Sequence, residues 1–249
     1  MATMFLADSI ITYTSDFARH SRILAYNSKK IKTFYPPIYR PKVDKRVQKI
    51  IREKIGSKSD FLIGVAARLA AEKGIEYLLE AIPEIESRIS NQELKKGEKK
   101  PTFKIVIAGS TNPVGEEKYK EKILRLVEKY KDYMVFLGEL KEAEMGAFYS
   151  LLDVLVLPSV NSTEAFGMVQ VEAMMTGVPV VVSDLPGVRV PVERTGMGIV
   201  TPCGDSEKLA TAVFEILSQR NKFIKAVKLV EDEFSADKTF KFYKELIGS

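Results

Sequence analysis

The chain has 249 residues, 45% of them hydrophobic and 29% charged, with 38 basic and 33 acidic residues and a net charge of +5. No apolar run reaches the roughly 20 residues of a membrane-spanning helix, and the first residues lack the basic and apolar segments of a secretion signal. The single cysteine and single histidine exclude a disulfide framework and a zinc cluster built from this chain alone. Tryptophan is absent and no basic stretch is interleaved with aromatic residues, so we expect no binding of nucleic acid. The composition favours a cytoplasmic protein, with peripheral contact at the inner face of a membrane left open.

Strand-like and helical patterns alternate from one end of the chain to the other. Strands are predicted over 9–14, 31–35, 61–66, 103–108, 134–137, 153–157 and 179–183. Helices are predicted over 16–26 (capped by Ser15), 43–55, 74–89, 116–130, 141–151, 167–175 and 206–218 (capped by Ser206), with two more before the end and a Lys-rich loop over 91–101. The run over 61–66 is continuously apolar, as in a strand covered on both faces. This alternation predicts an α/β fold with a doubly wound, Rossmann-like parallel sheet.

The organisation changes near Pro36 and Pro37. Residues 38–232 supply the βα units of one Rossmann-like domain, whereas residues 1–35 supply only a strand, a helix and a strand. A two-stranded piece cannot bury its own faces, so it must dock on this domain or belong to a second one. We therefore expect residues 1–35 to pack on a neighbour or to promote self-association through the apolar side chains of Phe5, Leu6, Ile10 and Ile11.

The first candidate site follows the strand over 61–66, in the segment 67–74 (ARLAAEKG). Arg68 and Lys73 bring two cations to a helix start, where backbone amides and the helix dipole also favour an anion such as a diphosphate. The alternative is a solvated turn with an ion pair to Glu72.

The second candidate site is the segment 158–174, after the strand over 153–157. Glu164 falls in the loop, Gly167 near the helix start and Glu172 within the helix. Two carboxylates so placed can accept hydrogen bonds from two sugars of one ligand, and the glycine lets backbone amides approach a phosphate. Alternatively, Glu164 is only an anion at a helix start and Glu172 lies on a solvated face. The apolar neighbours of Glu172 argue that it is not fully exposed and needs a partner.

The third pattern consists of turns after two other strands. Gly138, Glu139 and Leu140 follow the strand over 134–137, and Gly109 with Ser110 follow the strand over 103–108. Backbone groups at such strand ends often hold a nucleotide base, although most glycines there only make turns.

In this order and spacing, the patterns resemble glycosyltransferase family 4, retaining enzymes of the GT-B fold. The resemblance spans about residues 8 to 245 and rests on the ARLxxEKG segment, the glutamate pair separated by seven residues, TGVPVV over 176–181, and PCGD over 202–205. It implies that this chain is the C-terminal, donor-binding domain of such an enzyme. Residues 1–37 would then be a remnant of the acceptor domain plus the linker, and 233–249 a helix packing toward that domain.

The resemblance also implies roles for the candidate residues. Arg68 and Lys73 would hold the diphosphate and stabilise the leaving group, and Glu164 would bind hydroxyls of the donor sugar. The backbone of Phe166, Gly167, Met168 and Val169 would lie close to the sugar and phosphate. Glu172 would bind the ribose, while Gly138, Glu139 and Leu140 would line the base site. Such enzymes generally need no metal and no cofactor, and a UDP or GDP sugar is the expected partner.

The sequence departs from the family in lacking most of the acceptor domain. His20 matches no catalytic histidine and is expected at the surface, and Cys203 stands at a variable position. We expect the isolated chain to bind a nucleotide sugar weakly and to transfer the sugar poorly, since one wall of the active site is missing. A non-catalytic nucleotide-sugar module, or a donor subunit for a separate acceptor domain, is the main alternative. Another GT-B enzyme, such as an epimerase or phosphorylase, fits the glutamate pair less well.

Overall fold

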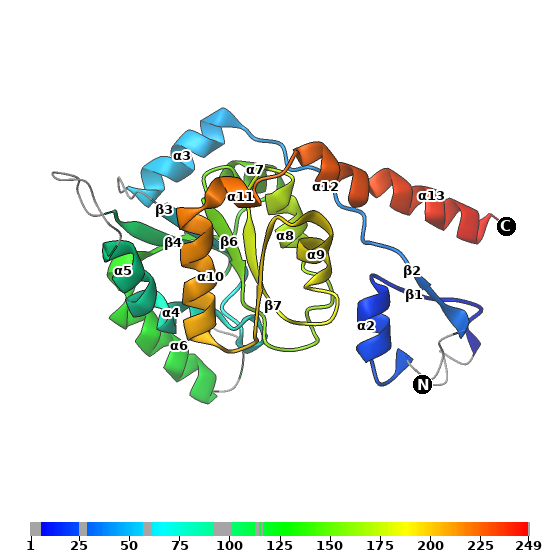
Figure 1. Cartoon of the computed structure of the whole chain (residues 1–249), viewed down its shortest axis with the longest axis horizontal. Helices are drawn as coiled ribbons and strands as arrows, with labels where there is room; N and C mark the ends of the chain where they lie inside the picture. The colour runs from blue at the N-terminus through cyan, green and yellow to red at the C-terminus, as the bar shows by residue number, and fades with distance from the viewer. Residues whose placement is uncertain are drawn as a thin grey trace.

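A computed structural model describes residues 6–24, 29–56, 61–91, 101–112, 115 and 117–248 (Figure 1). Phe5 and most of the predicted Lys-rich loop over 91–101 lie outside these residues.

The centre of the molecule is a six-stranded sheet in which every strand pairing is parallel. Its strands are β3 (Phe61–Ala66), β4 (Phe103–Ala108), β5 (Met134–Gly138), β6 (Val154–Leu157), β7 (Val180–Ser183) and β8 (Gly198–Thr201). The order is β5-β4-β3-β6-β7-β8, so the chain builds outward from β3 to one edge and then returns to place β6 on the other side of β3. The predicted doubly wound α/β fold is confirmed, and its strand order reverses between β3 and β6.

Helices cover both faces of this sheet and enclose two hydrophobic clusters (Figure 1). One face carries α4 (Ile75–Glu80), α5 (Ile82–Ser90), α6 (Glu117–Lys129), α10 (Ser206–Ser218) and α11 (Arg220–Phe223). The other carries α3 (Lys45–Ile55), α7 (Glu142–Tyr149), α8 (Met168–Met174), α9 (Val190–Thr195) and α12 (Val227–Glu233). Short 3₁₀ turns lie at Ala71–Lys73 (η2) and Lys131–Tyr133 (η3). Among the described helices, none combines the length and the apolar character needed to span a bilayer.

The helix predicted over 74–89 is two helices, α4 and α5, which meet at Ala81. Pro83 stands in the first turn of α5 and has no backbone N–H, so it cannot donate to the preceding turn. The ladder of backbone hydrogen bonds is interrupted there, although the apolar stripe of both helices stays buried against the sheet.

Other boundaries also differ from the prediction. Helix α2 (Ser15–His20) is shorter than the predicted 16–26, and its cap is Thr14, whose Oγ1 accepts the amide of Phe17 at 3.0 Å. Asp205, rather than Ser206, caps α10. The prediction omitted α9 and β8, and the chain closes with α11, α12 and α13 (Ala236–Ile247), one helix more than predicted.

The N-terminal residues form a separate parallel pair, β1 (Ile10–Thr12) and β2 (Ile31–Thr33). In Figure 1 this pair and α2 lie beside the main domain, near α9, and the chain crosses from β2 to α3. Of the apolar residues expected to be exposed, Leu6 is 84% exposed, whereas Ile10 and Ile11 are half-buried.

An aromatic cluster joins these N-terminal residues to the C-terminal helices. Phe34 stacks on Phe242 with ring centroids 4.5 Å apart, and Tyr35 contacts Phe234 at 4.8 Å. Phe166, from the main domain, contacts the rings of both Tyr35 (5.6 Å) and Phe234 (5.9 Å). The two ends of the chain are therefore packed on the same part of the main domain.

Replacing Phe234 by alanine tests this packing. The side chain is 1% exposed, and its loss removes ring contacts to both Tyr35 and Phe166. We expect Phe234→Ala to lower the free energy of unfolding by about 3–5 kcal/mol, the range for a large buried aromatic residue. Urea denaturation measures the change.

Phe240→Ala is the matched control, because Phe240 is an aromatic residue of the neighbouring helix α13 and is 46% exposed. Its substitution should cost much less, and equal losses in the two variants would contradict the anchoring role of Phe234.

Candidate functional site

The three predicted patterns lie at one edge of the sheet, the edge formed by the carboxyl ends of β3, β4, β5 and β6. Backbone hydrogen bonds tie the loops after these strands to one another. Leu69 donates to Ser110 (3.1 Å), Gly109 to Gly138 (2.8 Å) and Val160 to Glu72 (3.0 Å). Segments far apart in the sequence are thus held side by side where open parallel sheets bind ligands.

A glycine permits a close approach between two of these loops. Gly74 follows Lys73 with φ +60°, and a Cβ at this position would lie 2.2 Å from the carbonyl oxygen of Pro158. Only glycine accepts both the left-handed backbone and this distance. The loop after β3 consequently rests directly on the loop after β6.

That loop, residues 158–167 between β6 and α8, is called the glutamate loop below. Its Glu164 accepts a hydrogen bond from the ammonium group of Lys73, with Nζ and Oε2 2.7 Å apart. Ser159 Oγ lies 3.5 Å from the same oxygen. The side chains of Lys73 and Glu164 are 25% and 17% exposed, so the pair is shielded from most of the solvent. Two residues singled out in separate motifs are therefore in direct contact.

Arg68, the other predicted cation, makes the ion pair considered as an alternative. Its Nη2 lies 2.9 Å from Oε1 of Glu72, and its side chain is 53% exposed. A guanidinium group has five N–H donors, so this contact leaves others for a second anion. The ion pair and a phosphate-binding role are compatible.

Glu172 lies on α8 and is half-buried. Its Oε2 accepts a hydrogen bond from the Tyr149 hydroxyl at 2.7 Å, which supplies the partner that an acid among apolar residues requires. Burial raises the pKa of Glu172, although this hydrogen bond opposes the rise, and burial also raises the pKa of Tyr149 well above its ordinary value. Within the described part of the chain, no hydrogen bond or ion pair joins Glu172 to Glu164 or to the two cations.

The backbone between the two acids turns sharply into α8. Gly167 has φ +73° and precedes the helix without a side-chain cap. Phe166 is 2% exposed, whereas Met168 is 41% exposed and Val169 is half-buried. The buried amide of Gln170, which sequence reasoning missed, donates to the carbonyl groups of Phe166 (2.7 Å) and Val188 (2.9 Å). Gln170 therefore fixes the end of the glutamate loop.

The predicted base site lies at the end of β5. Gly138 has φ +75°, and a Cβ there would meet nothing within 4 Å. Glu139 is exposed, and Leu140 packs partly against the core. The turn thus presents an open backbone surface.

A cavity of about 710 Å³ lies between the N-terminal residues and the helices α9 and α13. Its walls include Tyr13, Arg19, Glu193, Arg194 and Lys238. None of the residues predicted to bind the donor is among the described residues that line it. The cavity and the predicted site are therefore not one pocket.

Comparison with known proteins identifies the family. The sequence pattern of the family described as "Glycosyl transferases group 1" matches residues 47–231, which contain every predicted site residue. The chain belongs to this family. The match includes both the Lys73–Glu164 pair and Glu172, so the glycosyltransferase domain extends over the whole six-stranded sheet.

Several curated glycosyltransferases are similar in sequence. An uncharacterized glycosyltransferase of Methanocaldococcus jannaschii is 33% identical over 67% of this chain and 38% of its own length. The phosphatidyl-myo-inositol mannosyltransferase of Mycobacterium leprae is 32% identical over 58% of this chain and 34% of its own. The GDP-mannose-dependent alpha-(1-6)-phosphatidylinositol monomannoside mannosyltransferase of Mycobacterium tuberculosis is 23% identical over 86% of this chain and 54% of its own length. The chain spans about a third to a half of the length of these relatives.

Solved structures share the fold. HepE of Anabaena, in complex with UDP and glucose, superposes on 97% of this chain and 63% of its own length with a TM-score of 0.77 at 20% identity. Sucrose-phosphate synthase of Thermosynechococcus elongatus superposes on 97% of this chain and 59% of its own length, with a TM-score of 0.70 at 22% identity. At these identities the likeness shows the fold alone, and the structures that share it are GT-B glycosyltransferases.

The raised pKa of Glu172 predicts a pH-dependent difference between the native glycosyltransferase domain and Glu172→Gln. Glutamine keeps an oxygen that can accept the Tyr149 hydrogen bond but carries no titrating group. A carboxyl group whose folded-state pKa exceeds its unfolded value binds its proton more tightly when folded, so the contribution of Glu172 to stability falls as pH rises from about 4.5.

The free energy of unfolding of Glu172→Gln minus that of the native chain should therefore increase with pH and level off above the raised pKa. Urea denaturation at a series of pH values measures this difference. A difference that stays constant with pH would contradict the burial of an acid at this position.

Proposed function

We propose that this domain binds a nucleoside-diphosphate sugar at the carboxyl edge of the sheet, between β3 and β6, for retaining transfer of the hexose to a hydroxyl acceptor. The observation that carries the proposal is the 2.7 Å contact between Lys73 and Glu164 where these two strands lie side by side. Parallel open sheets bind ligands where the strand order reverses, and here one cation and one anion meet at that position.

Lys73 is suited to contact two parts of the donor at once. An ammonium group has three N–H donors, and Glu164 accepts from one of them. The others can reach a phosphate oxygen while Glu164 stays bound. As the bond between the sugar and the diphosphate breaks, negative charge grows on the leaving phosphate, and a cation already in place stabilises that charge.

Arg68 adds a second cation on the same loop. Glu72 orients the guanidinium group of Arg68 through Nη2. The Arg68 side chain is exposed to solvent, and its other N–H groups can bind phosphate oxygens in a bidentate manner. With two such cations the diphosphate needs no divalent metal ion, and we propose metal-independent binding.

The two acids would hold the two sugars of the ligand. Glu164 keeps Oε1 for a hydroxyl of the transferred hexose, because Lys73 and Ser159 both contact Oε2. Glu172 keeps Oε1 for the ribose, because Tyr149 occupies Oε2. The backbone from Phe166 to Val169 would lie along the sugar and phosphate, and the turn from Gly138 to Leu140 would support the base.

We propose front-face transfer, a mechanism that requires no protein nucleophile. The bond between the anomeric carbon and the phosphate oxygen breaks while the acceptor hydroxyl attacks from the same side. The departing phosphate accepts the hydroxyl proton, which leaves a neutral glycoside and a nucleoside diphosphate. Lys73 and Arg68 stabilise that diphosphate throughout.

The similar proteins suggest the first donors to test. HepE of Anabaena has been crystallised with UDP-glucose, and the relative from Mycobacterium tuberculosis is GDP-mannose-dependent. Since the chain spans only part of its relatives, a nucleotide-sugar module that serves a separate acceptor domain is the alternative. Transfer of the sugar by this chain would favour the enzyme, and transfer that requires the addition of a separate acceptor domain would favour the module.

Removing each cation tests the phosphate site. We expect Arg68→Ala and Lys73→Ala each to weaken the binding of UDP or GDP by about 1.5–3 kcal/mol, the range for hydrogen bonds to charged groups. Isothermal titration calorimetry in the presence of EDTA measures both the loss and the independence from metal.

Arg125→Ala is the matched control. Arg125 forms an ion pair with Glu121 four residues away at 2.9 Å, as Arg68 does with Glu72, but it lies on the exposed surface of α6. Its substitution should leave nucleotide affinity unchanged. Native affinity in both Arg68→Ala and Lys73→Ala would remove these residues from the phosphate site.

A further inference from the structure

The glutamate loop is in contact with the N-terminal helix α2 through a single glycine. Gly187 lies between β7 and α9 with φ +86°. A Cβ there would lie 2.1 Å from the carbonyl oxygen of Ala165 and 3.2 Å from Cβ of Phe17. Gly187 is thus packed between α2 on one side and the residue that follows Glu164 on the other.

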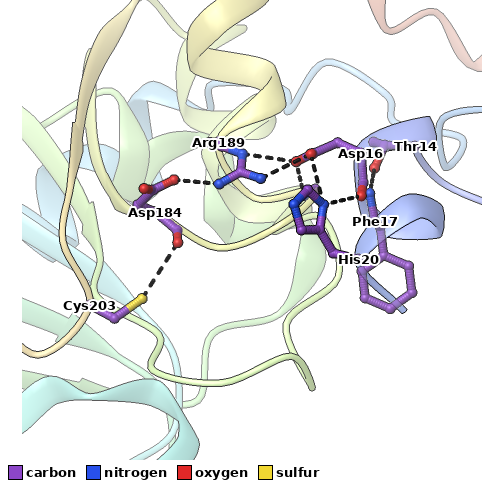
Figure 2. Close-up of polar contacts among 8 residues, drawn as sticks. Thr14, Asp16, Phe17, His20, Asp184, Arg189 and Cys203 are labelled. Atoms are coloured by element: carbon purple, nitrogen blue, oxygen red, sulfur yellow. Dashed lines mark hydrogen bonds and ion pairs between the residues drawn. The ribbon is translucent and has the colours of Figure 1, made fainter. Parts of the chain in front are cut away.

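Asp16 of α2 binds the chain at Gly187 and at Arg189, and Figure 2 shows its contacts with Arg189. Its Oδ2 accepts the backbone amide of Gly187 and Nε of Arg189, each at 2.9 Å, and its Oδ1 accepts Nη2 of Arg189 at 2.9 Å. The remaining terminal nitrogen, Nη1, lies 2.6 Å from Asp184 Oδ1. Asp16, Asp184, Gly187 and Arg189 together are called the clasp below.

The ion pair between Arg189 and Asp16 in the clasp is strengthened by its bidentate geometry and by shielding from solvent. Arg189 binds Asp16 in a bidentate manner, and their side chains are 20% and 13% exposed. Burial alone would raise the pKa of Asp16, but the hydrogen bonds from Arg189 and Gly187 lower it below the ordinary value. His20, whose Nδ1 lies 3.3 Å from Asp16 Oδ1, is 54% exposed and adds a weaker contact on the outer side.

A second set of contacts reaches the same loop from the N-terminal residues. Phe166, two residues after Glu164, is buried against the rings of Tyr13 at 6.1 Å and Tyr35 at 5.6 Å. The glutamate loop is therefore supported at two consecutive residues, at Ala165 by Gly187 and at Phe166 by the rings of Tyr13 and Tyr35.

We infer that Asp16 is a positioning residue for the sugar-binding carboxylate, because the clasp holds Gly187 against Ala165 and so fixes Glu164. This inference rests on the proposed function, in which Glu164 binds the transferred hexose. Lys73 and Arg68, which would hold the diphosphate, belong to a different loop, and among the described residues no hydrogen bond or ion pair joins either of them to the clasp. Loss of the clasp should consequently reduce affinity for the sugar part of the donor and spare affinity for the diphosphate part.

The test compares a nucleotide with its sugar in Asp16→Asn. Asparagine keeps the size of the side chain and an oxygen for the Gly187 amide but removes the charge that Arg189 binds. We expect affinity for UDP and GDP to stay within about twofold of the native chain, while affinity for UDP-glucose or GDP-mannose, whichever binds, falls about five- to tenfold. Calorimetry on the full chain measures both.

Asp44→Ala is the control for a general loss of stability. Asp44 caps α3 by accepting the amides of Arg46 and Val47, so its removal also deletes a carboxylate with backbone partners. The ratio of nucleotide-sugar to nucleotide affinity should be native in this variant. An Asp16→Asn ratio equal to that of Asp44→Ala would overturn the inference. Arg189→Gln should reproduce the Asp16→Asn ratio, and the double variant should lose no more than either single one, since both remove the same contact.

Hydrogen exchange separates this inference from the proposed function. Without ligand, the amides of residues 164–167 should exchange faster in Asp16→Asn than in Asp44→Ala. If the native chain binds none of the nucleotides or nucleotide sugars, the proposed function fails. The exchange rates alone then show whether the clasp holds the glutamate loop in place. Faster exchange over 164–167 supports it, and equal rates in the two variants overturn it.

Discussion

The contact between Lys73 and Glu164 is the interaction on which the candidate site depends, because it joins the two halves of the sheet at the point where the strand order reverses. Lys73 comes from the half that builds outward from β3, and Glu164 comes from the half that returns through β6. Neither loop could form the site alone. The domain therefore has to complete its central strand pairing before cation and carboxylate can meet, which couples the formation of the site to the formation of the core.

Much of this architecture could be predicted from the sequence because its signals are local. Continuous apolar strands, amphipathic helices and the spacing of charged residues after strands indicate a parallel sheet with a site at its carboxyl edge. The features that were missed also carried some local signals. Pro83 interrupts the helix predicted over 74–89, and Pro191 at the start of α9 with Gly196 at its end marks a short helix. Strand β8 has only four residues, three of them half-buried, so its apolar pattern is weak.

The supports of the site could not be predicted in this way, because they depend on contacts between distant segments. Nothing near Glu172 in the sequence points to Tyr149, which lies on the preceding helix and reaches the carboxylate only after both helices pack on the sheet. Phe166 was selected for its backbone, yet its ring is buried among Tyr13, Tyr35 and Phe234. Residue types and spacing selected the groups that we propose to face a ligand, whereas the tertiary fold decides which groups hold them in place.

Cations that support the site differ from cations suited to bind a ligand in how many of their hydrogen-bond donors are already in use. Arg189 has all three of its guanidinium nitrogens engaged by Asp16 and Asp184, so it has no nitrogen left without a carboxylate partner and acts as a support. Arg68 uses one nitrogen, and Lys73 uses one of three N–H groups. Exposure follows the same division for the two arginines, with Arg189 20% and Arg68 53% exposed. Because binding a phosphate requires donors that are not already committed, the cations suited to a diphosphate are those on the loop after β3, and the arginine beside α9 is suited to hold the glutamate loop against α2.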